Sequence, residues 1–414
     1  MGHIRLKATL ATCLASALVG LALAGAVPSP AAAAPAPLKI ALITSETGVA
    51  SQEFSTTAVG FLARIDLQNA KGGVNGHKLV PIVINDQSSL STVVTGVQDA
   101  ISQGVIGVVS VTPFMFNAYK YLYQAGLPVT GGFFDGPEWG TKPYTNMFAS
   151  DAGSVDPKYP ANTGFGLFMK AHGGTVLASY GYGISPSSTR SAIGTAISVR
   201  HAGLKVGVLD TSIPFGGVNF TTEALVAKSK HVNAVYAGLD NNSNFALATA
   251  LEQAGVKPKV VVFPTGYEPD VIHSPVWKNL QGDYFDSEFR PFSLPNAGTR
   301  QMAAALEKYQ HQPASQFPTY NIYESWIGAD LMIKGLELAG KNPTPAKVIK
   351  DLRGVTSYNA NGLLPESIDY STIFGHDLPK SCGWYLRAAK NGFVPTSSKP
   401  FCGTDIPGTT TISG

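Results

Sequence analysis

The sequence has little of what catalytic and nucleic-acid-binding proteins usually need. Of 414 residues only 14% are charged, and the net charge of +3 comes without clusters of Lys or Arg. A nucleic-acid surface is therefore not expected, because such surfaces concentrate basic side chains. The eight His are scattered, and the chain has no Gly-x-Ser-x-Gly elbow, Walker loop or Gly-x-Gly-x-x-Gly turn after its first strand. We expect neither an enzyme nor a bound cofactor or metal.

Long apolar runs are also scarce, and the one that stands out lies at the start. Arg5 and Lys7 precede an uncharged stretch, residues 8–27, and a small-residue segment at 31–34 follows it. This order predicts a secretory signal over residues 1–34 with an Ala-x-Ala cleavage site. The alternatives are an uncleaved transmembrane anchor and a lipid anchor on Cys13, which lies inside the apolar run instead of after it. We expect a secreted, periplasmic or cell-envelope-associated protein.

Cysteine is nearly absent from the chain once the signal is removed. Only Cys382 and Cys402 then remain. An even pair in an oxidising compartment predicts one disulfide that closes a hairpin or loop near the C-terminus. Two buried free thiols are the alternative reading. Zinc is poorly supported, because two Cys without a nearby His do not fill four coordination positions.

What the chain does have is a regular alternation of strand and helix patterns. Residues 38–44 form an apolar run typical of a strand buried on both faces, and residues 56–71 show helical spacing. The later strands are predicted at 79–84, 105–111, 127–130, 175–179, 204–209, 234–237 and 259–263, and the later helices at 91–103, 116–124, 188–201, 220–230, 244–254, 298–310, 320–339 and 343–352. Two successive series predict an α/β protein with two doubly wound parallel sheets. The tail from Gly362 is expected to be irregular.

Three stretches resemble the periplasmic leucine/isoleucine/valine-binding protein family, the type I solute-binding proteins of ABC transporters. The first, Leu38 to Leu79, reads LKIALIT-SETG and then, after a helix, NAKGGVNGHKL. The second is the acidic position Asn85-Asp86, and the third runs from Ala237 to Lys257. The resemblance implies the type I periplasmic binding protein fold, in which two lobes on a three-strand hinge close like a Venus flytrap around a ligand.

The resemblance also implies a layout and a function. Residues 35–150 and 286–362 would form lobe 1, residues 151–285 and 363–405 lobe 2 with the disulfide hairpin, and residues 406–414 a tail. The protein would be a monomer that captures an amino acid, amide or small carboxylate and passes it to an ABC transporter membrane permease. A ligand-sensing receptor module of the same fold and a secreted hydrolase are the alternatives.

Two departures from the family concern the ligand site. The family often has a disulfide after the second strand, where this chain reads Gln87-Ser88-Ser89. The positions of its ligand-binding Tyr and of its Tyr–Glu arrangement fall near Glu53-Phe54 and near Leu239 and Thr265. A plain branched-chain amino acid is therefore not the expected ligand.

The candidate ligand residues follow predicted strands, because open parallel sheets bind ligands at the carboxyl ends of their strands. By the resemblance, Thr112 would offer a hydroxyl to a ligand carboxylate at a helix start, although it could instead cap that helix. Asp135 and Asp240 could meet a cation or act as turn and cap residues. The full set is Glu53, Phe54, Val111, Thr112, Gly132, Phe133, Asp135, Tyr182, Ser187, Leu239, Asp240, Thr265 and Tyr267.

Overall fold

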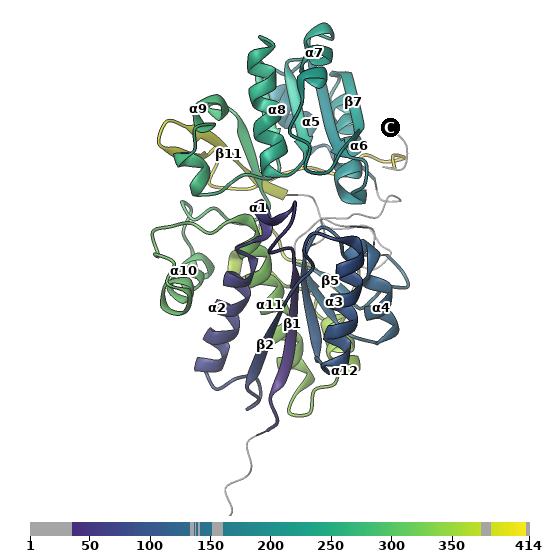
Figure 1. Ribbon diagram of the computed structural model, residues 1–414, viewed down its shortest axis with the longest axis vertical. Helices are drawn as coiled ribbons and strands as arrows, with labels where there is room; N and C mark the ends of the chain where they lie inside the picture. Colours follow the sequence, from purple (N-terminus) through teal and green to yellow (C-terminus); the bar gives the residue numbers. More distant parts are fainter. Residues whose placement is uncertain are drawn as a thin grey trace, which may run out of the picture. The chain divides into compact units, whose positions relative to one another are not determined.

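Five parallel strands form the first sheet of the protein, whose computed structural model describes residues 35–132, 136, 138–139, 141–150, 160–373 and 382–410 (Figure 1). Their order is β2-β1-β3-β4-β5. The apolar run predicted as the first strand forms β1, which lies between β2 and β3 and is buried because both faces of the sheet are covered. The strands are β1 (Leu38–Thr44), β2 (Leu79–Asn85), β3 (Gly107–Val111), β4 (Val129–Gly131) and β5 (Met147–Ala149).

The helices of this first half come from two distant parts of the chain. The long helix α11 packs against α2, β3 and β4, and most of its residues are buried. Its polar side chains are therefore exceptional, because a helix buried all round is normally apolar. The helices are α1 (Ser51–Phe54), α2 (Thr57–Ala70), α3 (Leu90–Ser102), η1 (Met115–Asn117), α4 (Tyr119–Gln124), α10 (Ala297–Gln310), α11 (Tyr320–Ala339), α12 (Pro345–Leu352) and η3 (Ala360–Gly362).

The second half is built on an eight-stranded sheet in the order β12-β11-β10-β9-β8-β6-β7, with β13 paired to β11. Its strands are β6 (Val176–Tyr182), β7 (Lys205–Ile213), β8 (Ala234–Gly238), β9 (Val260–Phe263), β10 (Tyr284–Ser287), β11 (Cys382–Ala389), β12 (Gly392–Pro395) and β13 (Phe401–Cys402). Its helices are α5 (Gly164–Ala171), α6 (Pro186–His201), α7 (Thr221–Ser229), α8 (Asn241–Gln253), η2 (Asp270–His273) and α9 (Trp277–Leu280). The predicted pair of doubly wound sheets is confirmed.

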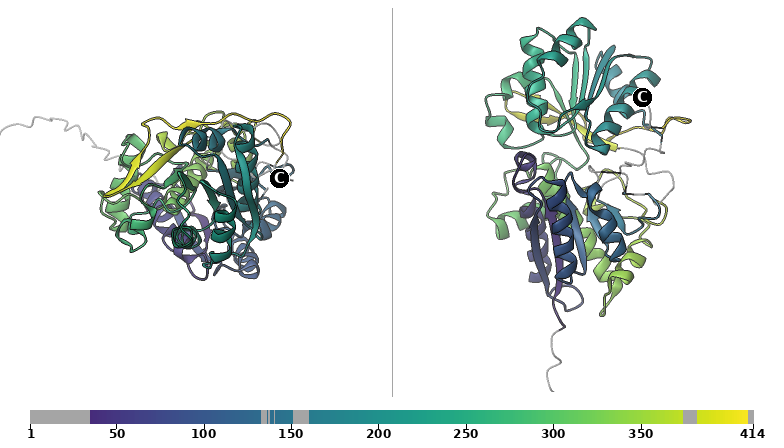
Figure 2. Two further views of the ribbon diagram at one scale, coloured as in Figure 1. Left: turned by 90° about the horizontal axis from the view of Figure 1, so that it is seen from above. Right: turned by 45° about the vertical axis from the view of Figure 1, so that its right-hand side comes forward.

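The C-terminal segment is more regular than expected. The sequence pattern predicted an irregular tail, but β11 is an eight-residue strand that pairs antiparallel with β10, β12 and β13. Figure 2 shows these last strands in yellow, as part of the second sheet. The prediction was wrong because the main pairing partner, β10, lies about a hundred residues earlier in the chain, so local sequence says little about it.

One expected boundary also needs correction. We placed residues 363–405 in the second lobe, but Leu363, Ile368, Tyr370 and Ile373 belong to the hydrophobic core of the first half. The Tyr370 hydroxyl donates a hydrogen bond to the carbonyl of Ala149. Burial of these apolar side chains therefore keeps the chain in the first half until at least residue 373.

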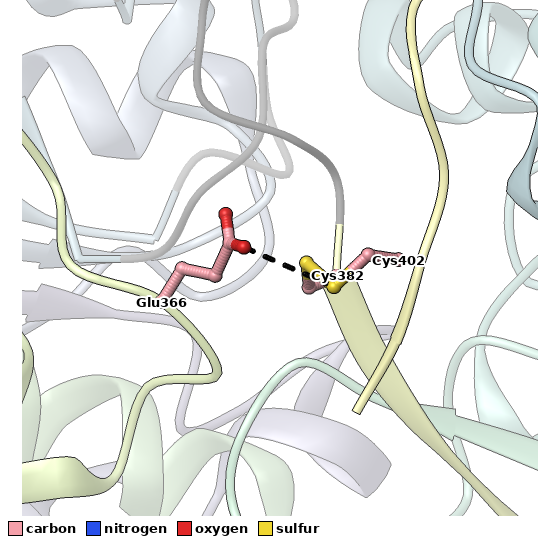
Figure 3. A group of neighbouring side chains, drawn as sticks. All are labelled: Glu366, Cys382 and Cys402. Atoms are coloured by element: carbon pink, nitrogen blue, oxygen red, sulfur yellow. Dashed lines mark hydrogen bonds between the residues drawn. A yellow bond between two sulfur atoms is a disulfide. The ribbon is translucent and has the colours of Figure 1, made fainter. Parts of the chain in front are cut away.

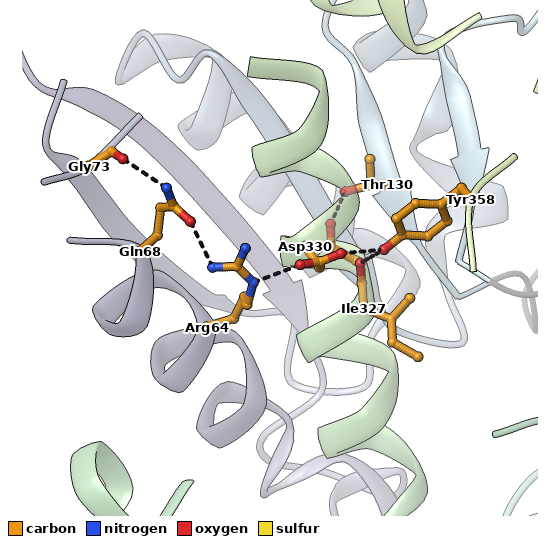
Figure 4. Close-up of polar contacts among 8 residues, drawn as sticks. Arg64, Gln68, Gly73, Thr130, Ile327, Asp330 and Tyr358 are labelled. Atoms are coloured by element: carbon orange, nitrogen blue, oxygen red, sulfur yellow. Dashed lines mark hydrogen bonds and ion pairs between the residues drawn. The ribbon is translucent and has the colours of Figure 1, made fainter. Parts of the chain in front are cut away.

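A buried polar network fixes α2 against α11 (Figure 4). Arg64 Nε lies 2.8 Å from Asp330 Oδ1, and Arg64 Nη1 donates to Gln68 Oε1 at 3.1 Å. Tyr358 donates its hydroxyl to Asp330 Oδ2 at 2.9 Å, and the guanidinium of Arg64 lies 5.9 Å from the Trp326 ring centroid. Both charges are thus paired and hydrogen-bonded, as buried charges must be.

Each sheet has a topological switch point, where consecutive crossovers leave in opposite directions. In the first sheet this point lies between the carboxyl ends of β1 and β3. In the second sheet it lies between the carboxyl ends of β6 and β8. Ligands of open α/β sheets bind at such points. In the part of the chain that the structure describes, no helix has both the length and the apolarity required to cross a bilayer.

Candidate functional site

The switch point of the first sheet holds a buried carboxyl group bound by two hydroxyls. Ser45 follows β1, Asp86 follows β2 and Thr112 follows β3, and all three are fully buried. Ser45 Oγ donates to Asp86 Oδ1 at 2.6 Å, Thr112 Oγ1 donates to Asp86 Oδ2, and the amide of Ser88 donates to Oδ1 at 2.9 Å. Burial raises the pKa of Asp86, and these hydrogen bonds partly offset that rise.

The switch point of the second sheet repeats the motif with a phenol in place of one hydroxyl. Tyr182 ends β6, and its hydroxyl donates to Asp240, which follows β8. Asp240 Oδ1 also accepts the amide of Ser243 at 2.9 Å, which makes Asp240 the N-cap of α8. Burial and the neighbouring Asp240 charge raise the pKa of Tyr182, so its phenol stays protonated.

Carboxyl groups from the two halves come within electrostatic reach of one another. Glu53 lies on α1 of the first half and is 8% exposed, whereas Glu268 follows β9 of the second half and is 6% exposed. Burial raises the pKa of Glu53 well above its ordinary value, and the charges of Glu268 and Asp240 raise it further. Burial and the charge of Asp270 raise the pKa of Glu268 to about 7, although its neighbour Asn241 partly offsets that rise.

Two buried asparagines accompany these carboxyl groups. Asn321 on α11 donates its Nδ2 to the backbone carbonyl of Glu53, and Asn241 lies beside Glu268. Both side chains are fully buried, and within the described ranges neither Oδ1 atom receives a hydrogen bond. We call Glu53, Asp240, Asn241, Glu268 and Asn321 the acceptor cluster. It draws on both halves, with Asp240 following β8 and Glu268 following β9 of the second sheet.

Aromatic side chains also connect the halves. Phe215 follows β7, and its ring packs at 5.6 Å from that of Phe114 in the first half and at 4.9 Å from that of Tyr182. Tyr267 stacks on Phe317 with centroids 4.7 Å apart and 10° between the planes. Tyr267, predicted as a ligand residue, thus packs against Phe317.

The remaining predicted residues divide between core and strand ends. Phe54, Val111 and Leu239 are buried in the two cores, and the amide of Gly132 donates to Ser110 at 3.1 Å. Thr265 donates to the carbonyl of Leu239 at 2.9 Å, and Ser187, in the first turn of α6, lies 3.2 Å from Ser185 Oγ. Phe133 and Asp135 lie outside the described residues.

Four residues that the structure brings to this region were not predicted from the sequence. Glu268 and Asn241 directly follow residues that were chosen, so the signal was a polar residue just beyond a strand end. Asn321 was detectable as an amide in the first turn of a mostly buried helix. Phe215 lies in a loop whose sequence carries no comparable signal.

A different group has the spacing of metal ligands, near the C-terminus (Figure 3). Among the described residues, only Glu366, Cys382 and Cys402 bring three such ligand atoms within 4.8 Å of one another. The two cysteines are joined in a disulfide, with 4.1 Å between their Cα atoms. A bonded sulfur has no proton to donate and is not a thiolate, so the 3.9 Å approach of Cys402 Sγ to Glu366 is neither a hydrogen bond nor a metal site.

Comparisons with known proteins agree with this architecture. The model of a family described as periplasmic binding protein matches residues 37–392. No curated protein matches the sequence. Among solved structures, a branched-chain amino acid transporter substrate-binding protein, LivJ of Streptococcus pneumoniae with isoleucine, has a TM-score of 0.70 at 14% identity, over 88% of this chain and 99% of that one.

Two further structures are similar to the same extent. The leucine-binding protein LivK of Thermotoga maritima has a TM-score of 0.71 at 13% identity, over 87% of this chain and 98% of its own. An ABC transporter solute-binding protein of R. palustris in complex with benzoate has a TM-score of 0.71 at 15% identity, over 90% and 98%. At these identities the likeness concerns the fold.

Proposed function

This chain belongs to the periplasmic binding protein family, and from that premise we propose that it captures a small polar ligand between its two halves for an ABC importer. The ligand would bind where the switch points of both sheets lie, and the halves would close over it by rotation about the chain crossings near residues 150 and 285 and beyond residue 373. No covalent step is needed.

The observation that carries this proposal is the meeting of carboxyl groups from separate halves. Glu53 and Glu268 come from different halves, both are nearly buried, and the charge of Glu268 adds to the burial that raises the pKa of Glu53. Like charges gathered in this way destabilise a protein unless a partner offsets them. A bound ligand with donor groups is such a partner.

The relatives do not identify that ligand. One solved structure holds isoleucine and another holds benzoate, so similar folds accept chemically different molecules. We propose that Glu53, Asp240 and Tyr182 contribute to the site, together with Glu268, Asn241 and Asn321, which sequence analysis did not select. Thr112 stays a candidate, although its hydroxyl donates to Asp86.

The finer features of the sequence belong to the same proposal. Residues 1–34 would direct the chain out of the cytoplasm. The Cys382–Cys402 disulfide would be stable in the oxidising compartment outside it. The mature protein would act as a monomer whose closed form docks on a membrane permease. Figure 1 shows the two sheets that such a closure would bring together.

A thermal-shift screen tests the proposal. Amino acids, amides, urea, amines and aromatic acids would be added in turn to the purified protein. A ligand that binds only the folded state increases the free energy of unfolding, by about 2.7 kcal/mol at a ligand concentration a hundredfold above Kd. The melting temperature therefore rises. Small-angle scattering should then show a smaller radius of gyration with the hit than without it. A hit that leaves the radius unchanged contradicts capture by closure.

A further inference from the structure

The hydroxyl expected to receive a ligand carboxylate, that of Thr112, is already in use, and so are two neighbouring donors. The hydroxyl of Thr112 donates to Asp86, the hydroxyl of Ser45 donates to the same carboxyl at 2.6 Å, and the amide of Gly132 donates to Ser110. Asp86 is fully buried. A carboxyl group of the protein itself thus occupies the donors at the first switch point, and a second one would have to compete with it.

The opposite holds at the acceptor cluster, where acceptors are abundant. Asp240 accepts hydrogen bonds from Tyr182 and Ser243, whereas among the described residues no lysine, arginine or histidine forms an ion pair with Glu53, Asp240 or Glu268. Nearly buried carboxylates are rarely left without a cation, because desolvation of the charge is costly.

The asparagine side chains provide an independent indication. Asn321 directs its Nδ2 to the carbonyl of Glu53, which fixes the orientation of its amide and leaves Oδ1 as an acceptor without a donor. Asn241, beside Glu268, has neither its Nδ2 nor its Oδ1 atom in a hydrogen bond among the described residues, so its amide can offer a donor and an acceptor to a ligand. A buried acceptor without a donor destabilises the folded protein, and a ligand with N–H groups would remove that cost.

The spacing of the carboxyl groups argues for a molecule and against a metal ion. Three ligand atoms of a metal site would lie within 4.8 Å of one another, and in the described ranges the three carboxyl groups of the acceptor cluster form no such set. Its carboxyl groups are therefore more widely spaced than the ligands of one ion. A cation of several atoms, with N–H donors at separate positions, matches that spacing better.

We propose that the ligand of this protein is an organic cation, carrying ammonium or guanidinium groups and needing no carboxylate, which binds between Glu53 and Asn321 of one half and Asp240, Asn241 and Glu268 of the other. This inference rests on the proposed function. Charge-assisted hydrogen bonds from nitrogen to carboxylate would supply most of the recognition.

Matched ligands test the charge requirement. The four-carbon series 1,4-diaminobutane, 4-aminobutanoate and succinate differs only in its end groups, and 3-methylbutylamine, leucine and 4-methylpentanoate form a branched series. Thermal shift and calorimetry at about 0.15 M salt would compare them. We expect the amines to bind at least tenfold more tightly than the corresponding acids.

A matched pair of variants locates the effect. Glu268→Gln keeps the shape of the side chain and should weaken amine binding at least tenfold, whereas Glu252→Gln, on the exposed face of α8, should leave it unchanged. A melting curve without ligand would establish that both variants fold.

The outcomes separate this inference from the function on which it rests. If succinate or 4-methylpentanoate binds and the amines do not, the ligand is not a cation, although the protein still captures a solute. If Glu268→Gln leaves amine binding intact, the acceptor cluster is not the site. If no compound of any class in the wider screen binds, both the inference and the proposed function fail.

Discussion

Phe215 of the second half packs edge-on against Phe114 of the first, with ring centroids 5.6 Å apart and 63° between the planes. Phe215 also contacts Tyr182, whose hydroxyl binds Asp240. One aromatic side chain thus links the loop after β3 of the first half to the residues that follow β6 and β8 of the second. Such a contact stabilises the arrangement in which the halves are together.

Removing this ring should loosen that arrangement without unfolding either half. An aromatic pair contributes about 0.5–1.5 kcal/mol beyond its buried area, so Phe215→Ala should speed ligand release roughly threefold to tenfold. Stopped-flow fluorescence with a ligand from the screen measures the rate. Val218→Ala, in the same loop and 64% exposed, is the control and should leave the rate unchanged. Equal rates for both variants would contradict the role of Phe215.

The ion pair of Arg64 and Asp330 leads to a prediction about stability alone. Arg64→Met leaves Asp330, which is 25% exposed, without its cation and should lower the free energy of unfolding by about 1–3 kcal/mol, because a partly desolvated charge loses its partner. Arg300→Met, on the exposed side of α10, is the control. Urea denaturation measures both. Unchanged ligand affinity in Arg64→Met would agree with the position of this network outside the acceptor cluster.

Much of the fold could be predicted because its signals are local. The apolar run at 38–44 and the helical pattern at 320–339 coincide with β1 and α11, since long apolar segments with clear periods leave few alternatives. β11 was missed, although its sequence is rich in aromatic and aliphatic residues. It is stabilised by pairing Tyr284 with Arg387, a contact that no local pattern reveals.

The candidate site was harder to predict than the fold, because it also depends on contacts between distant segments of the chain. Several strand ends were predicted, and two of the residues chosen there, Tyr182 and Asp240, stay candidates for the ligand site together with Glu53 on α1. Which side chains these residues contact depends on segments that lie far away in the sequence. Asn321 donates a hydrogen bond to the carbonyl of Glu53, 268 residues away in the chain. The ring of Tyr267 stacks on that of Phe317, 50 residues away.

Thr112 provides a test between a structural role and a ligand contact. Thr112→Val removes the hydroxyl that Asp86 accepts while keeping the shape of the side chain, and should cost about 1–3 kcal/mol of stability. Thr112→Ser retains the donor and should recover most of that loss. Denaturation and calorimetry together decide the question. A large loss of ligand affinity at unchanged stability would support the original prediction that Thr112 binds the ligand.

The disulfide should stabilise the C-terminal hairpin of the second half. It joins residues separated by 20 positions, and closing a loop of that length stabilises a protein by about 3 kcal/mol in the chain-entropy view. Addition of dithiothreitol, or the double change Cys382→Ala and Cys402→Ala, should lower the urea midpoint by similar amounts. If dithiothreitol also lowers the urea midpoint of the double variant, the decrease is not caused by loss of the disulfide.

Glu268 gives the protein a pH dependence whose sign follows from its burial. Its pKa in the folded protein is about 7, above the ordinary value of 4.5, so the folded state keeps a proton that the unfolded state has lost. The free energy of unfolding should therefore fall as the pH rises from about 4.5 to 7, by at most roughly 3 kcal/mol from this group. The raised pKa values of Glu53, Asp283 and Asp286 act in the same direction.

Melting curves of the ligand-free protein at pH 5.5 and pH 8 measure this effect. The wild-type chain should melt at the higher temperature at pH 5.5, and Glu268→Gln should narrow the difference by raising the melting temperature at pH 8. The narrowing is only partial, because the other buried carboxyl groups still titrate. Glu252→Gln should behave as wild type, since its side chain is exposed. If wild type melts at a higher temperature at pH 8, Glu268 is ionised at no cost in the folded protein, and the charge of the acceptor cluster must already be neutralised from within the chain.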